Sequence, residues 1–314
     1  AEANGRLPGT ILTKKLINQK TGLVIAGWLA FSYLMIDFSS NGSFYALQAA
    51  LYLLWILIAL KKDTKNKALY LGIITGLGYM VNFQAVILAP ASILVLVFQK
   101  EKHWTQKLKD IIIASLFGFA IALPWLIRNY LLFDDPLFSN YFTMTYFWGK
   151  IGLKKSISGD LMYFAPNFGD YISLIKNSLT NWLPHNVYYV VRKLFILAPF
   201  AFIFFLLAII DYLFSSERFK KLLPLLLVLG FHALTSTAHA ITKFRYFVPL
   251  FPLVLIISLE QIYTIKKTSY RNLIIGLTFA GIIFLSFLTY RAVPTHTYYY
   301  DGAITTDPFG RQGE

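Results

Sequence analysis

Residues 110–131 read DIIIASLFGFAIALPWLIRNYL, and the charged side chains of this stretch, Asp110 and Arg128, stand near its two ends. A helix needs about 20 apolar residues to cross the hydrocarbon core of a bilayer. Inside lipid, every backbone polar group must be bonded within the segment, so the stretch is predicted to be a transmembrane helix. An arginine at the end of such a helix either anchors it in the interface or serves a site.

The rest of the chain repeats this pattern of long apolar blocks. Of the 314 residues, 57% are hydrophobic and 14% are charged, whereas globular domains have roughly 45–50% and about 25%. The absence of cysteine excludes disulfides and thiolate metal sites. We predict an all-α, polytopic transmembrane helix bundle with about eight to nine membrane segments. The predicted spans lie near 21–38, 43–60, 68–98 (as two short segments), 110–131, 193–214, 222–241, 246–264 and 272–290.

The block 68–98 is too long for one crossing and short for two. Several glycines precede the polar triplet Asn82-Phe83-Gln84, and Pro90 follows it. This pattern favours two half-depth helices joined by a polar turn, either as a re-entrant pair or as a tight hairpin. Breaks of this kind are tolerated in a membrane only where protein shelters the backbone or the break lines a cavity.

The basic residues predict the orientation of the bundle, because cytoplasmic loops are enriched in lysine and arginine. Five short segments hold 18 of the 29 basic residues, and all five can be cytoplasmic if 68–98 turns back on itself. The net charge of +14 is then a topogenic signal rather than a sign of nucleic-acid binding. The basic residues of these segments are Arg6, Lys14, Lys15, Lys20, Lys61, Lys62, Lys65, Lys67, Lys100, Lys102, Lys107, Lys109, Arg218, Lys220, Lys221, Lys266, Lys267 and Arg271.

By alternation, the long segment 132–192 and the C-terminal tail are predicted to lie outside. Within the outer segment, Asp170 to Lys193 has apolar residues at the spacing of an amphipathic helix, which suits the membrane interface. We therefore predict a transmembrane domain over 1–291, with interfacial helices in its outer segment, and an outer tail over 292–314.

Two phrases place an arginine at the outer end of a span. The first is Leu123-Pro124-Trp125-Leu126-Ile127-Arg128-Asn129-Tyr130, and the second is Phe244-Arg245-Tyr246-Phe247 followed by Pro249 and Pro252. Arg128 ends an outward span and Arg245 begins an inward one, so both are predicted on the same side. We expect them to converge on one anion.

These two segments, taken with others in the sequence, make the chain resemble the GT-C superfamily of membrane glycosyltransferases. The resemblance is to the dolichyl-phosphate-mannose-protein mannosyltransferase group in particular (glycosyltransferase family 39 and relatives). Four stretches in the family's order carry the resemblance, and the match covers most of 14–290. They are Lys14 to Leu23, the glycine-bearing segment Gly72 to Gly78, Leu123 to Tyr130 with Asp135-Pro136-Leu137-Phe138, and Phe244-Arg245-Tyr246 with Pro249 and Pro252.

The resemblance implies a reaction and its partners. Such enzymes take a sugar from a polyprenyl-phosphate carrier and pass it to a protein, lipid or glycan acceptor on the extracytoplasmic face of the cell membrane. Because the leaving group is a lipid phosphate, cationic side chains are needed where its charge develops. Arg128, Arg245, Tyr246 and Lys243 are the candidate phosphate-binding residues that the family pattern implies.

The chain departs from the family pattern at its start. If Thr21 opens the family's third span, the first two spans and the acidic loop between them are expected to be missing from this sequence. Asp37 is then the candidate catalytic residue, and Asn41 stands where the family often has another acid. We therefore expect these residues alone to bind the carrier without transferring its sugar. No cofactor is assigned. A divalent metal stays an open alternative, because His232 and His239 share one helix face.

Other interpretations remain open. Arg128 and Arg245 are also placed where arginines snorkel to lipid phosphates. The acidic pair before Pro136 is most simply a turn. A multi-pass transporter or lipid flippase also uses broken helices, although the sequence shows no inverted repeat. A non-catalytic GT-C-like fragment is the third alternative.

Overall fold

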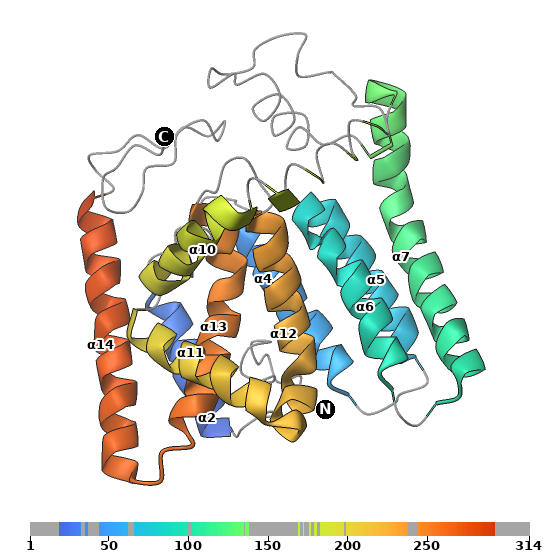
Figure 1. The fold of residues 1–314 in the computed structure, drawn as a ribbon. Coiled ribbons are helices and arrows are strands. Elements are labelled where there is room, and N and C mark those ends of the chain that lie inside the picture. Colours follow the sequence, from blue (N-terminus) through green and yellow to red (C-terminus); the bar gives the residue numbers. More distant parts are fainter. Residues whose placement is uncertain are drawn as a thin grey trace, which may run out of the picture. The chain divides into compact units, whose positions relative to one another are not determined.

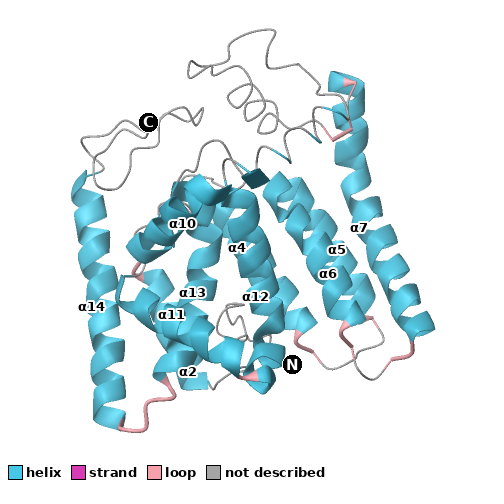
Figure 2. Ribbon diagram, in the orientation of Figure 1, coloured by secondary structure: helices cyan, strands magenta, loops and turns pink. Residues whose placement is uncertain are grey.

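The computed structural model describes residues 19–32, 35–36, 44–61, 66–99, 102–134, 136–137, 169, 172, 176, 179–180, 183–197, 199–237 and 244–292. Within these ranges every regular element is a helix (Figure 2), and this confirms the all-α prediction. The predicted outer tail and most of the outer segment 132–192 lie outside the described residues.

The described part of the chain contains ten α-helices and two 3₁₀-helices (Figure 1). The number of membrane segments, eight to nine, stays a prediction. The helices are α2 (Gln19–Ala30), α4 (Phe44–Ala59), α5 (Lys67–Val81), η1 (Phe83–Ile87), α6 (Leu88–Val97), α7 (Trp104–Phe133), α10 (Leu183–Leu197), α11 (Pro199–Phe214), α12 (Ser216–Thr237), η4 (Phe244–Leu250), α13 (Phe251–Ile262) and α14 (Thr268–Ala292).

Two predicted spans differ from the helices that form. The span predicted over 21–38 ends as α2 at Ala30, where the N–H of Ser32 bonds to the Leu29 carbonyl and tightens the last turn. The span predicted to begin at 193 is divided, because α10 ends at Leu197 and α11 begins at Pro199. Proline suits the first position of a helix and disfavours helical backbone in the residue before it.

Among the described helices, two are long and apolar enough to cross a membrane by themselves: α7 and the Thr268–Leu288 part of α14. With 30 residues, α7 is about 45 Å long, which exceeds the roughly 30 Å hydrocarbon core. Little of its apolar stretch is buried, and Leu116, for example, is 61% exposed. An apolar helix that the protein leaves uncovered is typical of a lipid-facing span.

The chain divides into two compact units. The first unit comprises residues 1–62, 192–229 and 243–314, and the second comprises 63–191 and 230–242. Each unit is described by itself below.

In the second unit, α5, η1 and α6 form a hairpin. The Thr75 and Ser92 hydroxyls lie 3.3 Å apart across it, and α5 packs along α6 (Figure 1). Lys67 and Val97 therefore lie at the same end, as the predicted orientation requires of the loops that flank the hairpin. With 15 residues, α5 is about 22 Å long, which is more than half and less than all of the hydrocarbon core.

The third helix of the second unit, α7, packs tightly on α5 through glycines. A side chain at Gly72 would collide with the Ala114 carbonyl, and a Cβ at Gly76 would lie 2.6 Å from the Gly118 carbonyl oxygen. Two glycines one turn apart thus let the two backbones approach closely, as in many helix pairs within membranes. Because both pairs advance in the same direction, α5 and α7 run parallel to each other.

In the first unit, α13 is the central helix. It packs against α2, α11, α14 and η4, and each of its residues from 251 to 259 is buried. At the end of α2, the Ser286 hydroxyl of α14 donates to the Phe31 carbonyl at 3.0 Å. This bond connects α14 to the end of α2.

Candidate functional site

The Arg128 side chain is exposed near the end of α7, and several neighbours hold its guanidinium. The guanidinium carbon lies 4.7 Å from the ring centre of Trp125 and 6.0 Å from that of Phe133. One Nη donates to the side-chain oxygen of Asn129 at 3.2 Å. Since a guanidinium carries five N–H donors, this bond leaves most of them for another acceptor. The group is a positioned cation, suited to a phosphate or a carboxylate.

The backbone around Arg128 is irregular on both sides. Pro124 lies inside α7 and cannot donate to the carbonyl four residues earlier, which weakens the helix one turn before Arg128. After α7, Asp134 adopts the left-handed conformation (φ 54°, ψ 19°) and its N–H bonds to the Tyr130 carbonyl at 2.9 Å. A turn follows at 136–137. The turn predicted from the acidic pair and Pro136 is confirmed; Asp135 lies outside the described residues.

The other predicted phosphate-binding residues belong to the first unit. Tyr246 is 7% exposed, and its ring centre lies 6.4 Å from that of Tyr45 on α4. Arg245 belongs to η4, but its side chain lies outside the described part of the structure, as do Lys243 and the candidate catalytic residue Asp37. Because Arg128 and Arg245 belong to different units, their convergence stays a prediction.

The helix break predicted at Asn82-Phe83-Gln84 is confirmed. Here α5 ends at Val81, Asn82 is extended, and η1 begins at Phe83. The Asn82 side-chain oxygen accepts the Gln84 backbone N–H at 3.2 Å, and its nitrogen donates to the Gln84 side-chain oxygen at 3.3 Å. Asn82 thus caps the new helix and fixes the orientation of the Gln84 amide.

One donor at the break has no partner among the described residues. The Gln84 side chain is 6% exposed, and its Nε2 donates no hydrogen bond within this part of the structure. Leaving a buried donor unpaired costs about 1–3 kcal/mol. Gly72 of α5 lies against Ala114 of α7, and Gly76 lies against Gly118. The same offset between the two parallel helices places the break at Asn82 level with Pro124 of α7. In the second unit, the helix break at Asn82 and Pro124 therefore lie at one level, about one helical turn from Arg128 along α7.

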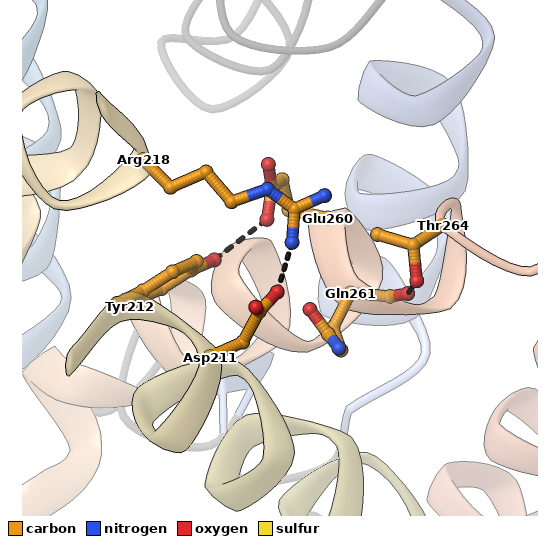
Figure 3. A network of polar contacts seen from close by, with 6 residues as sticks. All are labelled: Asp211, Tyr212, Arg218, Glu260, Gln261 and Thr264. Carbon is orange, nitrogen blue, oxygen red and sulfur yellow. Dashed lines mark hydrogen bonds and ion pairs between the residues drawn. The ribbon is translucent and has the colours of Figure 1, made fainter. Parts of the chain in front are cut away.

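A polar network that the sequence reasoning missed joins α11 to α13 in the first unit (Figure 3). The Tyr212 hydroxyl donates to the Glu260 carboxylate at 2.7 Å, and Arg218 pairs with Asp211. The signal was available, because acidic residues inside apolar spans are rare and usually paired. Glu260 and Asp211 each stand near the end of a predicted span.

Within the first unit, this network stands apart from Arg245. From Arg245 to Glu260 the chain runs through η4 and α13, which separates their backbones by about 25 Å along the axis. The distance is close to the thickness of the hydrocarbon core. The network therefore belongs to the other end of the unit, next to the basic segments predicted to be cytoplasmic.

The described residues contain no group of three or more His, Cys, Asp or Glu side chains that could hold a metal ion. His232 is buried in α12, and His239 lies outside the described residues.

The comparisons with known proteins bear on the N-terminal part of the chain. Residues 11–127 match the family of dolichyl-phosphate-mannose-protein mannosyltransferases. This confirms the family to which the sequence resemblance pointed, over that stretch. Neither the curated proteins nor the solved structures compared with the chain give a match.

The mannosyltransferase match covers two of the four stretches that carry the resemblance and part of a third. It includes the glycine-bearing helix α5 and the break after it, and it ends at Ile127, one residue before Arg128. The family implies a glycosyltransferase that uses a polyprenyl-phosphate sugar. Together with the two long apolar helices, it also indicates a membrane location.

Proposed function

We propose that this protein is a membrane glycosyltransferase that transfers a sugar from a polyprenyl-phosphate carrier to a protein, lipid or glycan acceptor on the extracytoplasmic face. The observation that carries the proposal is the positioned guanidinium of Arg128 at the end of a lipid-facing helix. A lipid phosphate is the anion that reaches such a place directly from the membrane.

The chemistry of transfer explains the need for that cation. The acceptor hydroxyl attacks the anomeric carbon of the sugar while the bond from that carbon to the phosphate oxygen breaks. The carrier leaves as a phosphate monoester with one more negative charge, and the hydroxyl proton passes to a base, for which Asp37 is the candidate. A fixed donor next to the leaving oxygen lowers the barrier, and loss of one such donor costs about 10²–10³ in rate.

The geometry favours substrate binding over simple anchoring. A snorkelling arginine extends its head freely into the headgroup layer. Here the guanidinium lies over the Trp125 ring, is within 6.0 Å of the Phe133 ring centre, and is also bonded to Asn129. A side chain held in this way has already lost much of its rotamer entropy, about 2 kcal/mol for a free arginine. Such pre-organisation favours the binding of a defined partner.

Arg245, Tyr246 and Lys243, which belong to the first unit, are further candidate phosphate-binding residues. Arg245 and Tyr246 belong to η4, which precedes the buried helix α13, and Pro249 and Pro252 shape the passage between the two helices. Arginine is suited to this role because its planar fork binds two phosphate oxygens at once, which lysine cannot do.

Carrier binding tests the proposal. The chain would be reconstituted in nanodiscs, and the binding and transfer of a radiolabelled polyprenyl-phosphate mannose would be measured. Arg128→Ala is expected to weaken binding by about 10- to 100-fold, with partial recovery in Arg128→Lys. Arg271→Ala is the matched control, because this guanidinium also lies over an aromatic ring, that of Tyr263, at 5.1 Å.

Three results would contradict the proposal. Equal affinity of wild type and Arg128→Ala would support the snorkelling interpretation. An equal loss in Arg271→Ala would indicate unspecific attraction of anions. Movement of the carrier across the bilayer with its sugar intact would identify the transporter or flippase alternative.

A further inference from the structure

Asn129 differs sharply from the arginine beside it. Its side chain is 1% exposed, whereas that of Arg128 is open to the surroundings. Buried amides are costly unless both their ends are bonded. Asn129 meets this condition: its Oδ1 accepts from Arg128 at 3.2 Å, and its Nδ2 donates to the Pro136 carbonyl at 3.4 Å.

The orientation of this amide follows from its partners. A guanidinium offers only donors, so the atom facing Arg128 must be the oxygen. A backbone carbonyl only accepts, so the atom facing Pro136 must be the nitrogen. Flipping the amide would break both bonds at once. Asn129 is therefore locked in one orientation.

The second bond reaches across the end of α7. Between Asn129 and Pro136 the chain passes through Asp134, which has positive φ, a conformation that residues other than glycine seldom adopt. The bond from Asn129 holds the Pro136 carbonyl near the end of α7. One buried side chain thus connects the turn after α7 to the guanidinium of Arg128.

We propose that Asn129 is a positioning residue that fixes the Arg128 guanidinium for the phosphate of the donor lipid and ties it to the turn at 134–137. This inference rests on the proposed function. Asn129 is not proposed to touch the substrate: it takes up one N–H of the guanidinium, which also lies over the Trp125 ring and near the Phe133 ring. Because this bond fixes the orientation of the guanidinium, it also fixes the directions of the remaining N–H groups.

A double-mutant cycle with Arg128→Ala tests this role, because two residues that act through one group are not additive. In nanodiscs carrying radiolabelled polyprenyl-phosphate mannose, Asn129→Ala is expected to lower affinity roughly tenfold. In the Arg128→Ala background the same change is expected to have almost no effect. A merely structural asparagine would weaken binding equally in both backgrounds.

The matched control lies on the same helix. Asp110 pairs with Lys102 at 2.6 Å near the start of α7, about 27 Å from Arg128 along the axis. Asp110→Asn removes a polar partner of α7 without touching the guanidinium, so affinity is expected to stay at the wild-type value. If Asn129→Ala fails to fold, Asn129→Asp replaces it. This variant keeps the shape but places a negative charge beside Arg128, and a larger loss of affinity is expected.

The outcomes separate the two claims. If Arg128→Ala itself leaves binding unchanged, the proposed function fails and the inference fails with it. If Arg128→Ala weakens binding but Asn129→Ala does not, the proposed function stands and the positioning role is overturned. Additive losses in the double variant overturn the positioning role as well.

Discussion

Helices α7 and α13 are both strongly apolar, yet their surroundings differ completely. In α13 every residue from 251 to 259 is buried, and most of its side chains are leucine, isoleucine or valine. In α7 burial is confined to Ala114, Gly118, Ala122 and Asn129 along 30 residues. Apolar composition therefore identifies a membrane helix but does not say whether protein or lipid covers it. The small size of the buried residues in α7 does indicate the one side on which a partner helix approaches.

The comparison also separates two ways of packing. A central helix such as α13 fills space with large side chains, and its stability depends on their volume. A helix such as α7 makes its main contact, with α5, through backbone that glycines expose, and its stability there depends on the absence of a side chain. The remaining face of α7 is exposed in the part of the structure that is described, and it leads to Arg128.

The largest expected effect is a cavity in α13. Leu255 is fully buried, so Leu255→Ala is expected to lower the free energy of unfolding by about 2–5 kcal/mol. The lower part of that range is favoured, because the unfolded helix would leave leucine in lipid rather than in water. Leu116→Ala on the exposed face of α7 is the control, with an expected change within about 0.5 kcal/mol.

Unfolding by SDS titration from mixed micelles measures both variants on one scale. Equal losses at Leu255 and Leu116 would contradict the difference between the two helices. They would mean that α7 is covered by protein as α13 is.

A smaller effect is expected at the glycine contact of α5 and α7. A Cβ at Gly76 would lie 2.6 Å from the Gly118 carbonyl oxygen and 2.7 Å from the Ile121 Cβ, so Gly76→Ala forces the helices apart. The expected loss of unfolding free energy is about 1–3 kcal/mol. Gly276→Ala in α14 is the control, because its Cβ would meet nothing within 4 Å. A stability for Gly76→Ala equal to that of Gly276→Ala would show that α5 and α7 do not pack as described.

Much of the fold was predictable from local chemistry. The break at Asn82 was predicted from polar residues inside an apolar block. Such residues favour a turn there, because their side chains can bond to the backbone groups that a helix end leaves unpaired. The turn after α7 followed from aspartate and proline. The division at Pro199 was not predicted. Apolar residues surround this proline, so hydrophobicity alone indicates one continuous span.

The candidate site was predictable only in part. The position of Arg128 at a span end was visible in the sequence, whereas its contact with Asn129 required the geometry of the helix end. The acidic residue inside a predicted span indicated that Glu260 has a partner. The sequence did not say that the partner is Tyr212, because the two residues lie far apart in the chain. The meeting of Arg128 with Arg245 depends on how the two units sit together, so it stays a prediction.

The most direct test of the central claim asks whether Arg128 recognises the phosphate of the carrier. Binding of a polyprenyl-phosphate mannose and of the corresponding polyprenol, which has the same chain but no phosphate, would be measured for wild type and Arg128→Ala in nanodiscs. The account predicts that the variant loses about 10- to 100-fold in affinity for the phosphate ligand and nothing for the polyprenol. Equal losses for the two ligands, or none for either, would contradict it.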